Sequence, residues 1–341
     1  MIPLLALADL EAGEAGTLDR LHDALRAHTL VHIDARAELG PEFFRALHEQ
    51  TRAFFALPEE AKRALDIDAS PNYRGHVAQG AEYTGGVPDL KESFEFGRET
   101  AAPEGEQLPW HTGLFGPNQW PDPAVLPRFR PVVEAYSAAV ERVARAVLRG
   151  LLLTLDQKAD GDGTVADGEL CSYSRLIRYR DPSGFGADQS RLERHTDSGL
   201  LTVSLQEQHG LEAETADGRW VAVQPPADVF TVFGGELLEV WTHGYYRACP
   251  HRVHNSALRA ERLSYASFFL PDLNRPLVPV DRAAGVRLSG PVAVPAGNSW
   301  LAGGRELSPT VPVGELEWAR MNVIFPGRNN DGTDTENGEG Q

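Results

Sequence analysis

Two kinds of hydrophobic spacing divide the chain. In the first half, apolar residues recur every three or four positions, which is the period of an amphipathic helix. One stripe runs through residues 40–65 and another through about residues 131–155. The first stripe consists of Phe43, Phe44, Leu47, Thr51, Phe54 and Phe55. The second consists of Val132, Val133, Tyr136, Val140, Val143, Val147 and Leu151. Both segments are predicted to be helical, and Pro58 predicts the start of a further helix within the first.

The second half changes to short apolar and β-branched runs separated by turn residues. These runs are "SYSRLIRYR", "LLTVSLQE", "WVAVQP", "VFTVFGG", "LLEVWT", "HRVHNS" and "RLSYASFFL". An earlier run, "HTLVHIDA", has the same character. Each is predicted to be a strand, and many short strands at this spacing favour an antiparallel barrel or a jelly roll.

The same patterns predict how the chain is divided. Residues 1–120 are expected to form an N-terminal helical and mixed region that packs, as one structural unit, on a core of residues 121–327. Within them, residues 70–86 are rich in Gly and Pro and predict a loop, while residues 275–327 are Pro- and Gly-rich with a few strand-like pieces. The polar tail, residues 328–341, is expected to be disordered.

Composition narrows the class of partner and the compartment. The chain has 341 residues and a net charge of −17 with no basic cluster, which argues against nucleic acid. Two cysteines do not make a disulfide framework, and the first residues resemble neither a signal peptide nor a membrane span, so we expect a cytoplasmic protein. The dominance of arginine over lysine favours a GC-rich bacterial source. The expected partner is a small molecule, and the expected state is a monomer or weak homo-oligomer.

Candidate chemistry begins in "RLERHTDSGLLTVSLQEQ". Residues two apart on a strand share a face, so His195 and Asp197 should point the same way as Leu201, Val203 and Leu205. An imidazole and a carboxylate on one buried face predict a metal site, whereas ordinary hydrogen-bonded residues are the alternative, since H-x-D tripeptides are common.

A third ligand is available downstream. "CPHRVHNS" offers His251 and His254, and two imidazoles with one carboxylate form the facial triad of non-haem Fe(II) enzymes, which leaves one side of the metal open. Thiolates would oxidise at such a site, so Cys171 and Cys249 are poor ligands.

An anion site is predicted on the next strand. Arg262 and Ser264 lie two residues apart, on the face that also carries Ala266 and Phe268. A buried guanidinium needs an anion, and a guanidinium with a hydroxyl suits a carboxylate. The alternative is an arginine paired with an Asp or Glu of the protein itself.

Together these residues resemble the isopenicillin-N-synthase-like branch of the iron(II)/2-oxoglutarate-dependent dioxygenases. His251 follows His195 by 56 residues and Arg262 follows His251 by 11, as in that family's H-x-D, H and R-x-S pattern. "HRV" selects His251 over His254. The resemblance extends over residues 2–271, including "HEQTRAFFALPEEAKRAL" and "GGELLEVWTHGYYRACPHRV". It implies an α+β, mainly β fold with a double-stranded β-helix (jelly-roll) core flanked by N-terminal helices.

The resemblance also implies roles for individual residues. His195, Asp197 and His251 would hold Fe(II) as the catalytic centre. The cosubstrate 2-oxoglutarate would chelate the iron and place its 5-carboxylate on Arg262 and Ser264. Tyr179 falls where the family has a tyrosine that reaches the same carboxylate, although Arg180 replaces the usual proline after it.

Four residues are candidates for the wall around a substrate: Arg74, Tyr83, Phe94 and Phe268. Arg74 could pair with a substrate carboxylate or lie at the surface, and the two phenylalanines could instead belong to the core.

The predicted function is an oxygenase that uses O2, Fe(II) and 2-oxoglutarate to oxidise, most commonly to hydroxylate, a small-molecule C–H bond, with release of succinate and CO2. Bacterial specialised metabolism, such as antibiotic biosynthesis, is the expected setting. Alternatives are an oxidative cyclase that needs no 2-oxoglutarate, as isopenicillin N synthase is, and a desaturase or an ethylene-forming enzyme. A ligand-binding module with an idle site and a zinc hydrolase are further alternatives, but an intact triad and an anion clamp argue against them.

Overall fold

The fold is built around two facing β-sheets. The computed structural model describes residues 2–84, 87–102, 104–105, 110–155, 165–166, 168–180, 190–215, 218–254, 261–280, 298–301 and 310–324. The larger sheet has eight strands, in the order β1 (Leu4–Ala6), β2 (Leu30–Asp34), β12 (Phe230–Gly234), β9 (Leu201–Gln206), β14 (Arg262–Leu270), β7 (Cys171–Tyr179), β6 (Glu92–Gly97) and β3 (Gly75–Val77). The smaller sheet has the order β11 (Trp220–Ala222), β10 (Leu211–Glu214), β13 (His251–His254) and β8 (Ser190–His195).

Pairing within both sheets is antiparallel, apart from the parallel pair of β1 and β2. A separate hairpin joins β4 (Tyr83–Thr84) to β5 (Val87–Pro88). Two facing antiparallel sheets of this kind make the predicted jelly roll, and the described strand runs confirm the sequence pattern at β2, β7, β9, β11, β12, β13 and β14.

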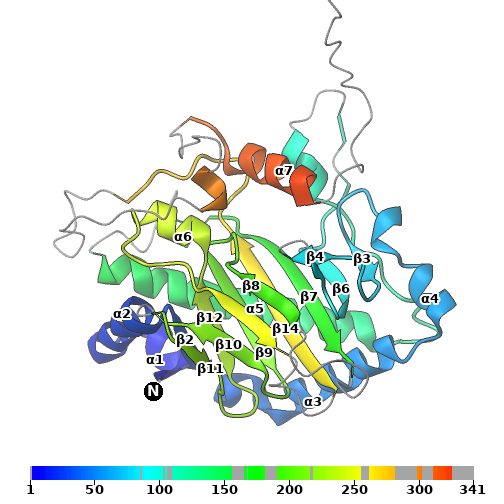
Figure 1. The fold of residues 1–341 in the computed structure, drawn as a ribbon, viewed down its shortest axis with the longest axis horizontal. Helices are drawn as coiled ribbons and strands as arrows, with labels where there is room; N and C mark the ends of the chain where they lie inside the picture. Colours follow the sequence, from blue (N-terminus) through cyan, green and yellow to red (C-terminus); the bar gives the residue numbers. More distant parts are fainter. Residues whose placement is uncertain are drawn as a thin grey trace, which may run out of the picture.

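Helices cover the outer face of the larger sheet, and Figure 1 shows α5 lying across it with α1 and α2 alongside. The helices are α1 (Leu7–Glu11), α2 (Ala15–His28), α3 (Arg36–Phe55), α4 (Glu59–Arg63), α5 (Phe129–Thr154), α6 (Glu236–Trp241) and α7 (Val313–Ile324), with the 3-10 turns η1 (Ile67–Ala69), η2 (Trp110–Leu114) and η6 (Ser299–Leu301). The long predicted helix is α5, shifted by two residues at its start. The other predicted stripe is α3, which is kinked at Gly40 (φ 73°) before Pro41, and the helix predicted at Pro58 is α4.

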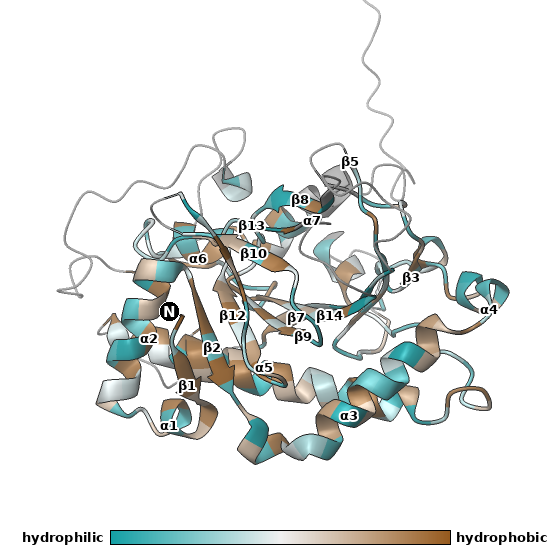
Figure 2. Ribbon diagram, turned by 60° about the horizontal axis from the view of Figure 1, so that its bottom comes forward, coloured by the Kyte–Doolittle hydropathy of each residue, from teal (hydrophilic) through white to brown (hydrophobic). Residues whose placement is uncertain are grey.

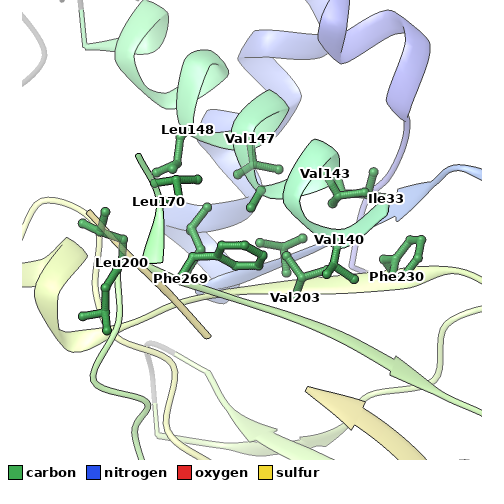
Figure 3. Close-up of a cluster of buried hydrophobic side chains, with 14 of the residues drawn as sticks. Ile33, Val140, Val143, Val147, Leu148, Leu170, Leu200, Val203, Phe230 and Phe269 are labelled. Atoms are coloured by element: carbon green, nitrogen blue, oxygen red, sulfur yellow. The ribbon is translucent and has the colours of Figure 1, made fainter. Parts of the chain in front are cut away.

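The main core lies between α5 and the larger sheet. In Figure 3, Val140, Val143 and Val147 of α5 face Val203 of β9 and Phe269 of β14. Apolar colour in Figure 2 is concentrated on the same layers, while the outer sides of α3 and α4 carry polar colour. Burial of these side chains contributes about 1.5–3 kcal/mol each, so this layer fixes the sheet that carries the site.

The prediction of which β9 residues face the cavity with His195 and Asp197 is wrong. Leu201, Val203 and Leu205 point into the core beneath α5, whereas Thr202 and Ser204 line the cavity that also contains His195 and Asp197. The alternation of faces cannot be counted from His195 through to Leu205, because the two segments are not one strand. β8 ends at His195 in the smaller sheet, and the chain crosses to the larger sheet before β9 begins.

Two other predictions from the sequence are corrected. "LLEVWT" is the helix α6 rather than a strand, because its apolar residues follow a helical spacing and all six residues of α6 are buried. Residues 313–324, predicted to be irregular with strand-like pieces, form α7.

The first 120 residues are integrated into the fold rather than placed beside it. They supply β1 and β2 at one edge of the larger sheet and β3 and β6 at the other. The boundaries predicted at residues 120 and 327 stay predictions, and the predicted tail at residues 328–341 lies outside the described residues. Within the described part of the chain, none of the helices has the length and apolar character required to cross a membrane.

Candidate metal centre and its cavity

Three potential ligands meet between the two sheets. His195 ends β8, His251 begins β13, and the two residues are directly paired across these strands. Nε2 of His195 lies 3.6 Å from Oδ1 of Asp197, and Nε2 of His251 lies 3.7 Å from the same oxygen. One ligand atom from each residue lies within 4.8 Å of the others, so the three could bind a single ion.

Backbone carbonyls orient both imidazoles. Nδ1 of His195 lies 2.8 Å from the carbonyl oxygen of Glu193, and Nδ1 of His251 lies 3.0 Å from that of Cys249. A carbonyl oxygen only accepts, so each Nδ1 donates a proton, and each Nε2 faces Asp197. The Phe233 ring stacks on His251 with 5.2 Å between centroids.

The environment keeps His195 neutral. Burial, and then the neighbouring His251, lower the pKa of His195 to about 4, although Asp197 acts in the opposite direction. Neutral imidazole is the form that binds metal ions, so the site is prepared for an ion near neutral pH.

Asp197 is held by a residue that the sequence did not suggest. The Thr202 hydroxyl donates to Oδ2 of Asp197 at 2.6 Å, which leaves Oδ1 facing the imidazoles. A carboxylate with one oxygen fixed by a hydroxyl is a typical outer contact of a metal ligand. Thr202 went unnoticed because parity placed it on the opposite face.

The donor set fits Fe(II). Two imidazoles and one carboxylate match the facial triad of non-haem iron oxygenases, and no thiolate belongs to the group. Cys171 and Cys249 are free thiols, and burial raises the pKa of each to about 12, so neither is a ready ligand.

The triad opens into a cavity of about 490 Å³. Arg262, Ser264, Ala266 and Phe268 line it, as their shared parity predicted. Tyr179 also lines it and is the direct cross-strand partner of Arg262.

Arg262 lacks a carboxylate partner among the described residues. It is fully buried, and its Nε donates to the Gln208 carbonyl at 3.1 Å while one Nη donates to Oε1 of Gln206 at 2.9 Å. Its Nη1 has no hydrogen-bond acceptor among the residues that the structure describes. Burial lowers the Arg262 pKa, an effect that Tyr179 opposes. A buried guanidinium with an unused donor fits an incoming carboxylate such as that of 2-oxoglutarate.

The substrate candidates divide. Arg74 and Phe268 line the cavity. Phe94 does not: it is fully buried in the main core, with its ring 4.7 Å from that of Phe54, so its predicted contact with substrate is wrong. Phe94 shares its face of β6 with Phe96, and that face is turned toward the core. Tyr83 lies in β4, and its side chain is outside the described part of the structure.

The cavity also has charged residues that the sequence did not suggest. Lys91 pairs with Glu82 and Asp89, and Arg175 pairs with Glu82 at 3.1 Å. All four line the cavity, as does the buried Glu317 of α7. Glu82, Asp89 and Lys91 lie in the loops on either side of the β4–β5 hairpin, Arg175 lies in β7 and Glu317 lies in α7, and no local sequence signal connects them.

Comparison with known proteins agrees with this geometry. Residues 2–123 match the family model described as non-haem dioxygenase in morphine synthesis N-terminal, and residues 171–271 match that of the 2OG-Fe(II) oxygenase superfamily. All three triad residues and Arg262 lie within the second match.

Two curated relatives illustrate the similarity. The 2-oxoglutarate-dependent dioxygenase caaD of Aspergillus niger is 32% identical over 245 residues, which span 67% of this chain and 71% of the relative. The homoarginine-6-hydroxylase 2-ODD-233 of Oryza sativa subsp. japonica is 29% identical over 275 residues, spanning 76% and 79%.

Solved structures share the fold. A full-length Neurospora crassa protein, in complex with alpha-KG and thymine, superposes with a TM-score of 0.75 at 20% identity, over 95% of this chain and 97% of that one. JOX2, in complex with 2OG, Fe and JA, gives 0.66 at 21% identity, over 93% and 88%. The fold and these matches show that the chain belongs to the 2OG-Fe(II) oxygenase superfamily, whose enzymes need Fe(II), 2-oxoglutarate and O2.

Proposed function

We propose that this oxygenase hydroxylates a C–H bond of a small carboxylic acid. In this proposal His195, Asp197 and His251 hold the iron, and Arg262, Ser264 and Tyr179 hold the 5-carboxylate of 2-oxoglutarate. The observation that carries it is a buried His-Asp-His triad in the same cavity as a buried arginine with an unused donor.

The bound iron and cosubstrate supply the chemistry, which couples decarboxylation of 2-oxoglutarate to succinate and CO2 with oxidation of the substrate. The chain's own residues bind and orient. The carbonyls of Glu193 and Cys249 fix the two imidazoles, and Arg262 and Tyr179 anchor the far end of the cosubstrate. The burial of the cavity walls excludes water, which protects the protein from stray oxidation.

A second buried arginine supports a carboxylic acid as the substrate. Arg74 is 4% exposed and donates to the backbone carbonyls of Tyr73 and Leu114, at 3.4 and 3.2 Å, while its Nε finds no acceptor within the described part of the chain. No ion pair joins it to a carboxylate of the described residues. A buried cation of this kind is stabilised by an anion from a ligand.

Arg74 lies at the opposite end of the cavity from Arg262. Arg262 pairs with Tyr179 at one end of β14 and β7, whereas Arg74 lies over the Tyr173 ring, 5.0 Å from its centroid, near the other end. Phe268 is paired with Tyr173 and also lines the cavity. The proposed substrate therefore places its carboxylate on Arg74 and an apolar portion against these two rings.

The relatives supply a first probe. Several curated relatives are named homoarginine-6-hydroxylases, while the Neurospora crassa structure contains thymine. Homoarginine carries a carboxylate and thymine does not, so Arg74 favours homoarginine-like acids.

The bacterial source, cytoplasmic location, role in specialised metabolism and monomeric or weakly oligomeric state remain proposals from composition and analogy. The two curated relatives described above are from a plant and a fungus.

The cosubstrate assignment is tested with Arg262→Gln. We expect the visible absorption band that requires both Fe(II) and 2-oxoglutarate, measured under anaerobic titration, to need roughly 10²-fold more 2-oxoglutarate, because a buried charge pair is worth about 3 kcal/mol. His195→Ala should abolish the band.

The matched control is Arg252→Gln, which removes an arginine paired with Glu212 outside the cavity. The absorption band of this variant should appear at the same concentrations of 2-oxoglutarate as in the wild type. An unchanged titration in Arg262→Gln would refute the clamp, and oxidation of substrate without succinate would favour a cyclase of the isopenicillin N synthase type.

The substrate assignment is tested with L-homoarginine and its methyl ester. The acid should perturb the same absorption band at lower concentration than the ester in wild type, and Arg74→Gln should remove that preference while leaving the affinity for 2-oxoglutarate unchanged. Equal binding of acid and ester by the wild type, or an undiminished preference in Arg74→Gln, would exclude Arg74 as the carboxylate site.

A further inference from the structure

The loop that carries Asp197 is bound on one side by α6. The Glu236 amide donates to the Asp197 carbonyl at 2.8 Å, and the Leu237 amide donates to the Ser198 carbonyl at 3.1 Å. These are the first amides of the helix, which have no partner within it. The loop thus completes the helix, and the helix fixes the loop's backbone.

The Glu236 side chain makes a second connection. One carboxylate oxygen accepts from the hydroxyl of Thr196, the residue between the ligands His195 and Asp197. The other oxygen accepts from the amide of Ser299, at 2.9 Å, and from its hydroxyl. Glu236 is 8% exposed, so three donors satisfy a nearly buried carboxylate.

The segment with Ser299 holds the same loop at another point. The Trp300 indole donates to the Ser198 carbonyl at 2.6 Å, and the Asn298 amide donates to the Glu236 carbonyl at 3.1 Å. Residues about 100 positions apart in the sequence therefore meet around residues 196–198.

We propose that Glu236 is a positioning residue that fixes the iron-ligand loop and couples it to residues 298–300. Glu236 does not touch the ligand atoms. It holds Thr196, and with it the separation of His195 from Asp197, so that both ligands can reach one ion. Glu236 would keep the ligand atoms in position for any ion that binds there, whichever reaction the protein performs.

Metal affinity tests this role without turnover. Co(II), a redox-stable substitute for Fe(II), is titrated into the metal-free protein and followed by absorption. We expect Glu236→Ala to weaken binding by about 10–100-fold, the usual effect of losing an outer contact of a metal site. Glu236→Gln keeps an acceptor and should lie between this variant and the wild type.

The matched control is Glu239→Ala, on the same helix and similarly buried, whose carboxylate contacts Asn298 but not the ligand loop. It should bind Co(II) like the wild type. If Glu236→Ala does not fold, Thr196→Val removes the same contact from the other side and should weaken binding alike.

Wild-type affinity in Glu236→Ala or in Thr196→Val would overturn the proposal. So would an equal loss in Glu239→Ala, which would show a general effect of disturbing α6. Co(II) binding needs no 2-oxoglutarate, so failure of the proposed reaction would appear separately, as a wild-type protein that binds metal without consuming 2-oxoglutarate.

Discussion

Side-chain contacts just outside the triad decide how well it can hold an ion. Thr202 donates to the Asp197 oxygen that faces away from the imidazoles, while carbonyls fix both histidines. Each ligand therefore has one free donor atom and one constrained atom, and the entropy of ordering the site has already been lost in folding.

Thr202→Val tests whether the Thr202 hydroxyl fixes the Asp197 carboxylate for metal binding. The change keeps the shape of the side chain and removes the hydroxyl, so Asp197 can rotate. We expect metal affinity, measured by Co(II) titration, to fall about tenfold. Ser204→Ala, at the next cavity-facing position of β9, should leave it unchanged, and equal affinities in all three proteins would show that Thr202 does not matter.

Among the secondary-structure elements, the close packing of α6 against the ligand loop depends on Gly235, which has no side chain. A Cβ on Gly235 would lie 2.1 Å from the carbonyl oxygen of Gly199 and 3.0 Å from that of Asp197. Both are backbone atoms, so neither can move aside alone. The helix and the loop can approach this closely because Gly235 leaves room.

Gly235→Ala should therefore separate α6 from the loop. We expect a loss of about 1–3 kcal/mol in the free energy of unfolding, as in other overpacked sites, with weaker Co(II) binding. Gly16→Ala in α2 is the control, because its Cβ meets nothing within 4 Å and alanine favours a helix. Thermal melting of the two variants should move in opposite directions, and a Gly235→Ala variant as stable as the wild type would contradict the argument.

At the scale of the whole molecule, buried titratable groups make stability depend on pH. Burial lowers the pKa of His32 to about 4. Burial raises the pKa of Glu92, but hydrogen bonds from His76 and Lys62 and the charges of Arg178 and Lys62 together lower it to about 2. The unfolded chain takes up protons on both groups at higher pH than the folded chain. Stability should fall from about pH 6.5 to 4 through His32 and from about 4.5 to 2 through Glu92.

Urea denaturation between pH 7 and 4 measures the loss of stability that protonation of His32 causes. His32 is 5% exposed, so its contribution at neutral pH relative to pH 4 is at most about 3 kcal/mol. His32→Asn keeps a partner for Thr231 and should reduce the slope between pH 6.5 and 4 without removing it, because His195 takes up its proton over the same range. A wild-type slope in the variant would assign the acid sensitivity to other groups.

Elements with strong periodicity, and the residues of the motifs, could be predicted from the local sequence alone. The stripe of α5 and the alternation of β14 are local, and burial of one face imposes them wherever the chain goes. For the same reason Arg262, Ser264 and Phe268 were placed on one face correctly. α6 is so short that its helical spacing is hard to tell from a buried strand, and the apolar residues of α7 follow no clear helical stripe.

Which side chains line the proposed metal site depends on how the two sheets pack together. This packing turned Thr202 rather than Val203 into the cavity, because the chain changes sheets between His195 and Leu201. It buried Phe94 in the core and brought Glu236 and Ser299 together around Thr196. Contacts between distant segments depend on how the sheets pack, and that packing is a property of the whole chain rather than of any segment within it.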